Sequence, residues 1–87
     1  MYNLSDLPAI EAELTEAYKA DRESKHYDNL LQKYTGPATG LMYDEDSGKV
    51  KISEDWAPDE EGNILKIDEA TGPATGKVLK DGVIVSA

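Results

Sequence analysis

One hexapeptide, Thr-Gly-Pro-Ala-Thr-Gly, occurs twice in this short chain, at Thr35–Gly40 and again at Thr71–Gly76. Each copy leads into a run of residues typical of a β-strand. Glycine accepts positive φ, proline holds φ at about −65° and lacks an amide donor, and threonine hydroxyls bond locally. The duplication therefore predicts that the backbone follows the same path twice. It leaves the function open, because the two copies are either plain connectors or two equivalent contacts with a repeating partner such as a capsid lattice.

The length and composition of the chain limit the size of its core. With 87 residues there is enough sequence for one modest core, so we expect a single domain over residues 1–87. Only 17 residues are Leu, Ile or Val, and Phe is absent, so Tyr and Trp side chains must supply much of the remaining burial. We expect a chain of this kind to gain stability from a protein partner or by forming a homo-oligomer.

The charge balance is strongly acidic, with 18 acidic and 9 basic residues and a net charge of −9. This balance opposes attraction to phosphates and to anionic lipids, so we expect neither nucleic acid nor a membrane as a partner. The N-terminus lacks the features of a secretory signal, and no stretch reaches the roughly 18 apolar residues of a membrane span. The absence of Cys excludes disulfides and thiolate metal sites. We therefore expect a soluble protein made in the cytoplasm without a signal peptide.

Residues 1–34 are predicted to form a helical arm. Ser5 and Asp6 are the expected caps. At helical spacing the apolar side chains form two faces separated by about 140°; the first holds Leu7, Ile10, Leu14, Ala17 and Tyr18, and the second holds Tyr27, Leu30, Leu31 and Tyr34. Either a kink or short turn near residues 22–26 produces two helices on one core, or one long helix contacts different partners along its length. We favour the long or kinked helix, ending where Thr35 is followed by glycine and proline.

Residues 35–87 have a different pattern, with short apolar and β-branched runs separated by glycine and acidic turns. The strand candidates are 41–43, 49–52, 63–67, 77–79 and 83–85. Segments 44–48 and 80–82 contain the glycines typical of hairpin turns, so adjacent strands are expected to pair. The connection 53–62 is expected to be a loop pinned by Trp56. The predicted fold class is α+β, an N-terminal helical arm (1–34) followed by a small antiparallel β-meander (35–87) with repeated Gly-Pro turns.

A second repeated pattern combines an acidic turn, a glycine and a β-branched strand start. It occurs at residues 44–50, 59–64 and 68–78. Units of this kind resemble the β-meander modules of small bacteriophage virion proteins, including head decoration and tail-associated components. The resemblance covers the C-terminal half and implies a structural role in a virion, with a capsid protein, a tail protein or further copies of the chain as the partner. It carries no functional residue over to this sequence.

No residue pattern predicts catalysis or metal binding. The segment Asp44–Gly48 places Asp44 and Asp46 as the first and third positions of a calcium loop, but the sixth position is Lys49 where such a loop needs glycine. His26 lies in the most polar helical segment with no nucleophile motif beside it. The carboxylates flanking Trp56 lie in turns, so a peptide-binding surface there is less expected than a tryptophan that holds a loop. We expect no enzyme, no cofactor and no metal.

The expected function is therefore that of a non-enzymatic structural or interaction protein, a phage virion or assembly component that binds a neighbouring protein. The helix or the C-terminal strands would supply the contact. The candidate contact residues are Tyr27, Leu30, Leu31, Tyr34 and Trp56. The alternative is a small acidic inhibitor of a host nucleic-acid-binding protein, which presents carboxylates in the manner of a DNA mimic. Binding by such an inhibitor would weaken as salt rises.

Overall fold

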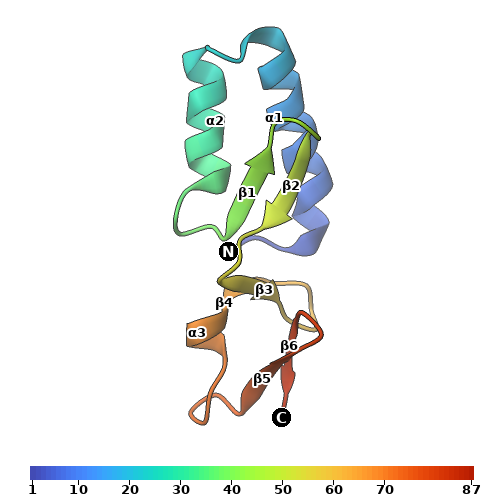
Figure 1. The fold of residues 1–87 in the computed structure, drawn as a ribbon, viewed down its shortest axis with the longest axis vertical. Coiled ribbons are helices and arrows are strands. Elements are labelled where there is room, and N and C mark those ends of the chain that lie inside the picture. The colour runs from blue at the N-terminus through green and yellow to red at the C-terminus, as the bar shows by residue number, and fades with distance from the viewer.

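The computed structural model describes all 87 residues and has the α+β architecture that the sequence predicts. A 3-10 turn precedes two helices, and three pairs of short strands with one helical turn complete the chain (Figure 1). The elements are the 3-10 turn Leu4–Asp6, α1 (Leu7–Asp21), α2 (Lys25–Thr35), β1 (Leu41–Asp44), β2 (Lys49–Ile52), β3 (Trp56–Pro58), β4 (Ile64–Lys66), α3 (Ile67–Ala70), β5 (Lys77–Lys80) and β6 (Val83–Ser86).

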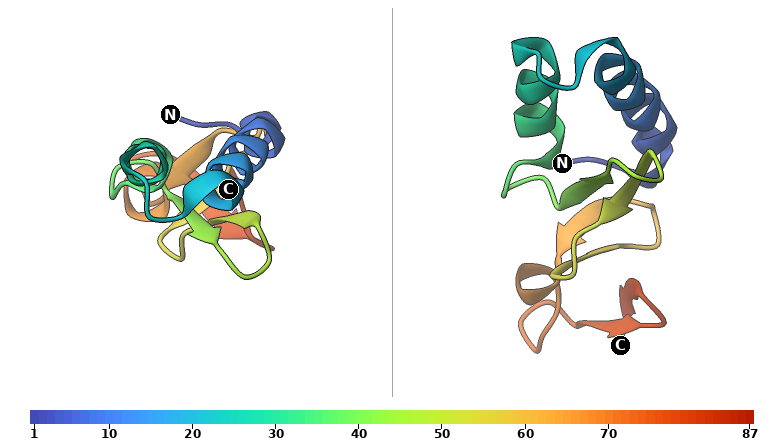
Figure 2. Two further views of the ribbon diagram at one scale, coloured as in Figure 1. Left: turned by 90° about the horizontal axis from the view of Figure 1, so that it is seen from above. Right: turned by 45° about the horizontal axis from the view of Figure 1, so that its top comes forward.

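The helical arm is a hairpin of two helices, so the preference for one long or kinked helix was wrong. α1 runs to Asp21, and α2 returns beside it after a short turn (Figures 1 and 2). Ser24 explains the break, because its backbone is extended (ψ 152°) and its hydroxyl accepts the Tyr27 amide hydrogen at 3.1 Å. This is an N-cap that starts a new helix. The turn alternative is confirmed, and α2 ends at Thr35 as expected.

The first cap differs from the prediction. Asn3 caps the 3-10 turn, where its side chain accepts the Ser5 amide hydrogen at 3.0 Å while Asp6 accepts the Asn3 amide hydrogen at 2.9 Å. The predicted caps make no capping bonds to α1: Ser5 is not an N-cap residue, and the side chain of Asp6 makes no hydrogen bond to the start of the helix. The cap lies earlier than predicted because the extra 3-10 turn precedes α1. Reciprocal bonding of this kind is a capping box.

The strands form three separate two-stranded antiparallel sheets, β1–β2, β3–β4 and β5–β6. The predicted hairpins β1–β2 and β5–β6 are present, and the turn between β5 and β6 has positive φ at both Asp81 (53°) and Gly82 (78°), as a type I′ turn requires. The predicted loop 53–62 was wrong in part, because Trp56–Pro58 forms β3 and pairs with β4. The helical turn α3 was not predicted.

The core lies where the two helices cover one face of β1–β2. Leu41 and Val50 are 2% and 7% exposed and lie on the face that packs against α1 and α2. The opposite face carries the exposed Met42 and Lys51. The core cluster has nine buried residues, namely Ile10, Leu14, Ala17, Tyr27, Leu30, Tyr34, Leu41, Val50 and Ile64.

The molecule is elongated, with extents of 46 × 18 × 18 Å. The helices and β1–β2 occupy one end, and α3 with β5–β6 occupies the other (Figures 1 and 2). The N-terminal segment joins the two parts near the middle, because the Ile64 amide donates to the Tyr2 carbonyl at 2.8 Å and the Leu4 amide donates to the Gly62 carbonyl at 2.8 Å. This antiparallel contact connects residues that lie more than half the chain length apart in the sequence.

Candidate protein-binding surface

The helical candidates for partner contact mostly lie inside the molecule. Tyr27, Leu30 and Tyr34 are 2%, 7% and 9% exposed and belong to the core cluster. Their face is covered by the chain's own β1–β2 hairpin, so their prediction as partner-contacting residues is corrected. Leu31 and Trp56 are half-buried and pack against the same core.

The buried tyrosines have carboxylate partners at the rim of the core. The Tyr27 hydroxyl donates to Glu45 Oε1 at 2.9 Å, and the Tyr34 hydroxyl donates to Glu13 Oε2 at 2.5 Å. Burial, together with the bond to Glu45, raises the pKa of Tyr27 far above its ordinary value. The bond to Glu13, together with burial, raises the pKa of Tyr34. Both hydroxyls therefore remain protonated and structural at neutral pH.

The threonine side chains of the two hexapeptides make the same hydrogen bonds. In each copy the first threonine hydroxyl donates to the carbonyl four residues before it, at 2.5 Å for Thr35 and 2.8 Å for Thr71. The hydroxyl of the second threonine donates to the carbonyl of the first glycine, at 2.8 Å for Thr39 and 3.0 Å for Thr75. That same hydroxyl then accepts the first strand amide at 3.3 Å in both copies.

The repetition extends into the hairpin that follows each hexapeptide. Ser53 donates its amide hydrogen to the Gly40 carbonyl at 2.8 Å, and Ala87 donates to the Gly76 carbonyl at 3.0 Å. Each unit is therefore a helix end, a hexapeptide and an antiparallel hairpin, with a longer loop in β1–β2 than in β5–β6. The predicted repetition of the backbone path holds for the later part of the hexapeptide and the hairpin, but the first glycines differ, with φ −65° at Gly36 and +116° at Gly72.

The two copies differ in what covers the last glycine. A Cβ built on Gly40 would come to 2.8 Å from Trp56 Cγ and still closer to Cδ2, so the indole lies directly over this glycine. A Cβ built on Gly76 would meet nothing within 4 Å. A depression of about 440 Å³ lies beside Gly76, lined by Thr71, Gly72, Pro73, Gly76, Lys77, Val78, Leu79 and Ala87.

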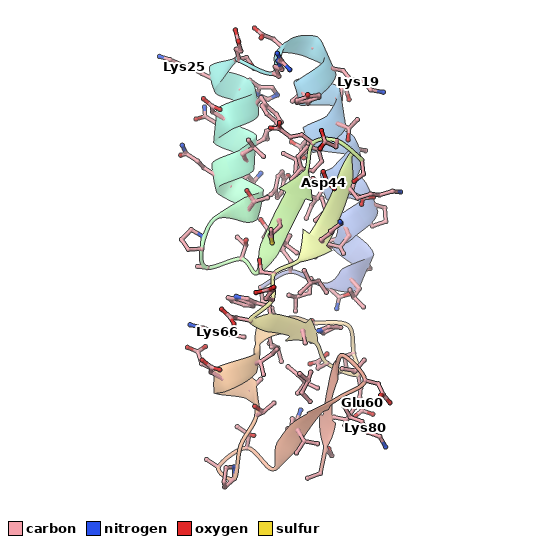
Figure 3. All side chains as sticks on the ribbon, viewed as in Figure 1. Lys19, Lys25, Asp44, Glu60, Lys66 and Lys80 are labelled. Carbon is pink, nitrogen blue, oxygen red and sulfur yellow. The ribbon has the colours of Figure 1, made fainter.

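The hairpin beside this depression exposes apolar side chains on both faces. Val78 and Leu79 are neighbours in β5, so they point to opposite faces, and they are 44% and 45% exposed. β6 is the inner strand, because Ile84 is 1% exposed and bridges to Asp59. β5 is the outer strand, and Lys80 lies at its end near the tip of the hairpin (Figure 3).

Acidic side chains in the loops accept hydrogen bonds from backbone amides of the same turns. Asp59 Oδ1 accepts the amide hydrogens of Glu61 and Asn63, each at 2.9 Å. Asp44 Oδ1 accepts the Asp46 amide hydrogen at 3.0 Å, and a bond from the Ser47 side chain is the main cause that lowers the pKa of Asp44. No group of three or more acidic or histidine side chains is arranged to hold a metal ion. His26 is exposed on α2.

Comparison of the chain with protein-family models, with curated proteins and with solved structures gives no match. None of the helices has the length and apolar character needed to cross a membrane. The region around the second hexapeptide has a distinct geometry. It combines an open depression, two exposed apolar side chains and an outer strand, which are features of surfaces that bind other proteins.

Proposed function

We propose that this chain is a non-enzymatic protein-binding module that uses its C-terminal hairpin as the contact surface. The observation that carries the proposal is the exposure of both Val78 and Leu79 on the outer strand β5. A two-stranded hairpin is marginal in water, and its apolar side chains gain most when at least one face is covered. A partner that packs on one face of β5 would bury one of these side chains, and a partner that also wraps the outer edge would bury part of the other.

The position of the hairpin supports the proposal. β5–β6 lies at the end of the 46 Å axis opposite α1 and α2 (Figure 1). A neighbouring protein can therefore approach it without touching the core. Association would come mainly from added apolar contact area, at about 25 cal/mol per Å² before the costs of binding.

The biological setting that we propose is a phage virion or a related assembly. This choice rests on the acidic-turn, glycine and strand units of the C-terminal half, which resemble those of small virion proteins. In an assembly the chain is present in many copies, so a modest contact repeated across a lattice contributes substantial stability in sum. The partner would be a capsid or tail protein, or a further copy of the chain.

The test uses particles purified from the phage or host that encodes the chain. Wild-type protein and the double variant Val78→Ser/Leu79→Ser would be followed by sedimentation and quantitative mass spectrometry. We expect the wild type to sediment with particles and the double variant to remain in the soluble fraction. Met42→Ser is the matched control, because Met42 is an exposed apolar residue (54%) at the equivalent position of β1–β2.

Two outcomes would contradict the proposal. Wild-type protein that never sediments with particles would exclude the virion role. A double variant that sediments like the wild type would exclude the hairpin as the contact surface. If the protein binds a soluble host protein instead, and moderate salt abolishes that binding, the acidic-inhibitor class is supported in place of the virion role.

A further inference from the structure

We infer that the depression beside the second hexapeptide binds an aromatic side chain of a partner protein, presented by an extended acidic segment, as Trp56 covers the first hexapeptide. This inference rests on the proposed function and adds the chemistry of the partner. It follows from the internal repeat, because one copy of the unit is seen with its aromatic occupant and the other without.

The two sites are alike at the last glycine of the hexapeptide and at the start of the following strand. Gly40 and Gly76 have φ of 77° and 68°, and each accepts the amide hydrogen of the residue that follows its hairpin. The strand after each glycine begins with an amide bonded to a threonine hydroxyl at 3.3 Å. Because glycine has no side chain, the surface over Gly76 has a shape like that of the surface over Gly40.

The occupant of the first site comes from the segment that follows β2. Ser53 is bonded to Gly40, and three residues later the indole of Trp56 lies over that glycine. The Trp56 amide hydrogen donates to the Ser53 carbonyl at 3.0 Å, so a tight turn delivers the ring. Glycine allows this approach because any Cβ would collide with the ring.

The second site has the room for such a ring. The depression of about 440 Å³ includes Gly76 and the exposed side chain of Val78. This volume lies within the range of about 300–1,000 Å³ that is typical of clefts for small groups. An indole or phenol ring placed there would cover Gly76 and bury part of Val78, and aromatic rings bring the largest apolar area per side chain.

The ring must come from a different protein. The six aromatic side chains of this chain are buried or half-buried, and all of them belong to its own core or pack against it, so a second folded copy has no free ring to offer. Trp56 itself is held in β3 over Gly40. The partner is therefore a distinct protein with an accessible aromatic residue in an extended segment.

Charge indicates the flanking residues of the partner segment. In the first unit Glu54 and Asp55 precede Trp56, and both carboxylates are exposed. The second unit has Lys77 at the lining of the depression and Lys80 further along the same strand. Carboxylates in the partner segment would therefore be attracted to β5, although the chain as a whole is acidic.

The probe for this inference is the blocked hexapeptide Ser-Glu-Asp-Trp-Ala-Pro, which copies residues 53–58 of the chain. It would be titrated into the full ¹⁵N-labelled protein and followed by NMR. We expect saturable shifts of the Gly76, Lys77, Val78 and Ala87 amides, with a Kd on the order of 0.1–1 mM for so short a peptide. The same peptide with alanine in place of tryptophan should produce none of these shifts.

Two protein variants locate the binding. Val78→Ser, at a position that is 44% exposed, should weaken peptide binding by about fivefold or more because part of the covered apolar surface is lost. Met42→Ser, at the equivalent exposed position of β1–β2, should leave the Kd unchanged. A circular dichroism spectrum identical to that of the wild type would show that each variant is folded.

Absence of saturable shifts, or equal shifts with the alanine peptide, would overturn the inference. It would also be overturned by a dimer of the chain alone that Val78→Ser dissociates, because the occupant would then be a second copy. The proposed function is tested separately: particle binding that depends on Val78 and Leu79, without peptide binding, would retain the hairpin as a contact surface and reject the aromatic occupant.

Discussion

At the scale of single residues, Gly40 and Gly76 form a natural pair for measuring the Trp56 contact. Both have positive φ, so alanine at either position costs about 1 kcal/mol of backbone strain. Only Gly40→Ala also drives a methyl group into the indole, so its total cost should be about 3 kcal/mol. Urea unfolding of the two variants measures the difference. Equal losses would mean that Trp56 does not pack on Gly40 in solution.

The tyrosine–carboxylate pairs predict an alkaline loss of stability. A tyrosine whose pKa is raised in the folded state contributes stability that is complete below its unfolded pKa of about 10 and declines as pH rises above that value. The raised pKa of Tyr27 and Tyr34 therefore predicts that the free energy of unfolding declines above about pH 10, so that it is lower at pH 11 than at pH 9. The double variant Tyr27→Phe/Tyr34→Phe should flatten this decline. The control Ile10→Val, in the same core, should lower stability equally at both pH values.

At the scale of elements, the N-terminal segment holds the helical end to β4 through Asn3. Its side-chain amide donates to the Glu61 carbonyl and to Asn63 Oδ1, each at 3.0 Å, while its carbonyl oxygen caps the 3-10 turn. Asn3→Ala should lower the free energy of unfolding by about 1–2 kcal/mol, because both the cap and the tie are lost. Asn3→Asp keeps the capping oxygen and should cost less. Thermal unfolding distinguishes the two variants, and equal losses would show that the capping oxygen contributes nothing.

The sequence predicted those elements whose signals are local. The glycines of the loops 44–48 and 80–82 located two hairpins, and the duplicated hexapeptide located a repeated turn. The helix break was one of two alternatives but was not the preferred one, because it depends on a single Ser24 cap inside a polar stretch. β3 was missed because Trp56–Pro58 is short and contains proline, which is unusual inside a strand.

The candidate site was harder to predict because apolar periodicity does not say what covers a face. The face of Tyr27, Leu30 and Tyr34 meets the chain's own β1–β2 hairpin, and only the packed structure shows this. The exposed surface beside the second hexapeptide depends on a contrast between two distant glycines. The sequence contains the repeat, but the position of Trp56 over one copy is a result of tertiary packing.

At the scale of the whole molecule, the core is concentrated at one end. The Cα radius of gyration is 14.5 Å, whereas a compact domain of this length is expected near 12 Å. The nine-residue core cluster contains no residue of β5 or β6, and Ile84 is the one buried side chain in that hairpin. The free energy of local opening should therefore be lower at the C-terminal end, where fewer apolar contacts must be broken.

Hydrogen exchange measures this difference directly. We expect the hydrogen-bonded amides of β5–β6 to exchange at least about tenfold faster than those of Leu14, Leu30 and Val50 in the main core. A bound partner that covers Val78 should slow exchange in β5–β6 and leave the main core unchanged, because the free energy of binding adds only to the opening of the covered hairpin. Equal protection of both ends in the free protein would mean that the elongated chain opens as one cooperative unit, and that the hairpin is stable without a partner.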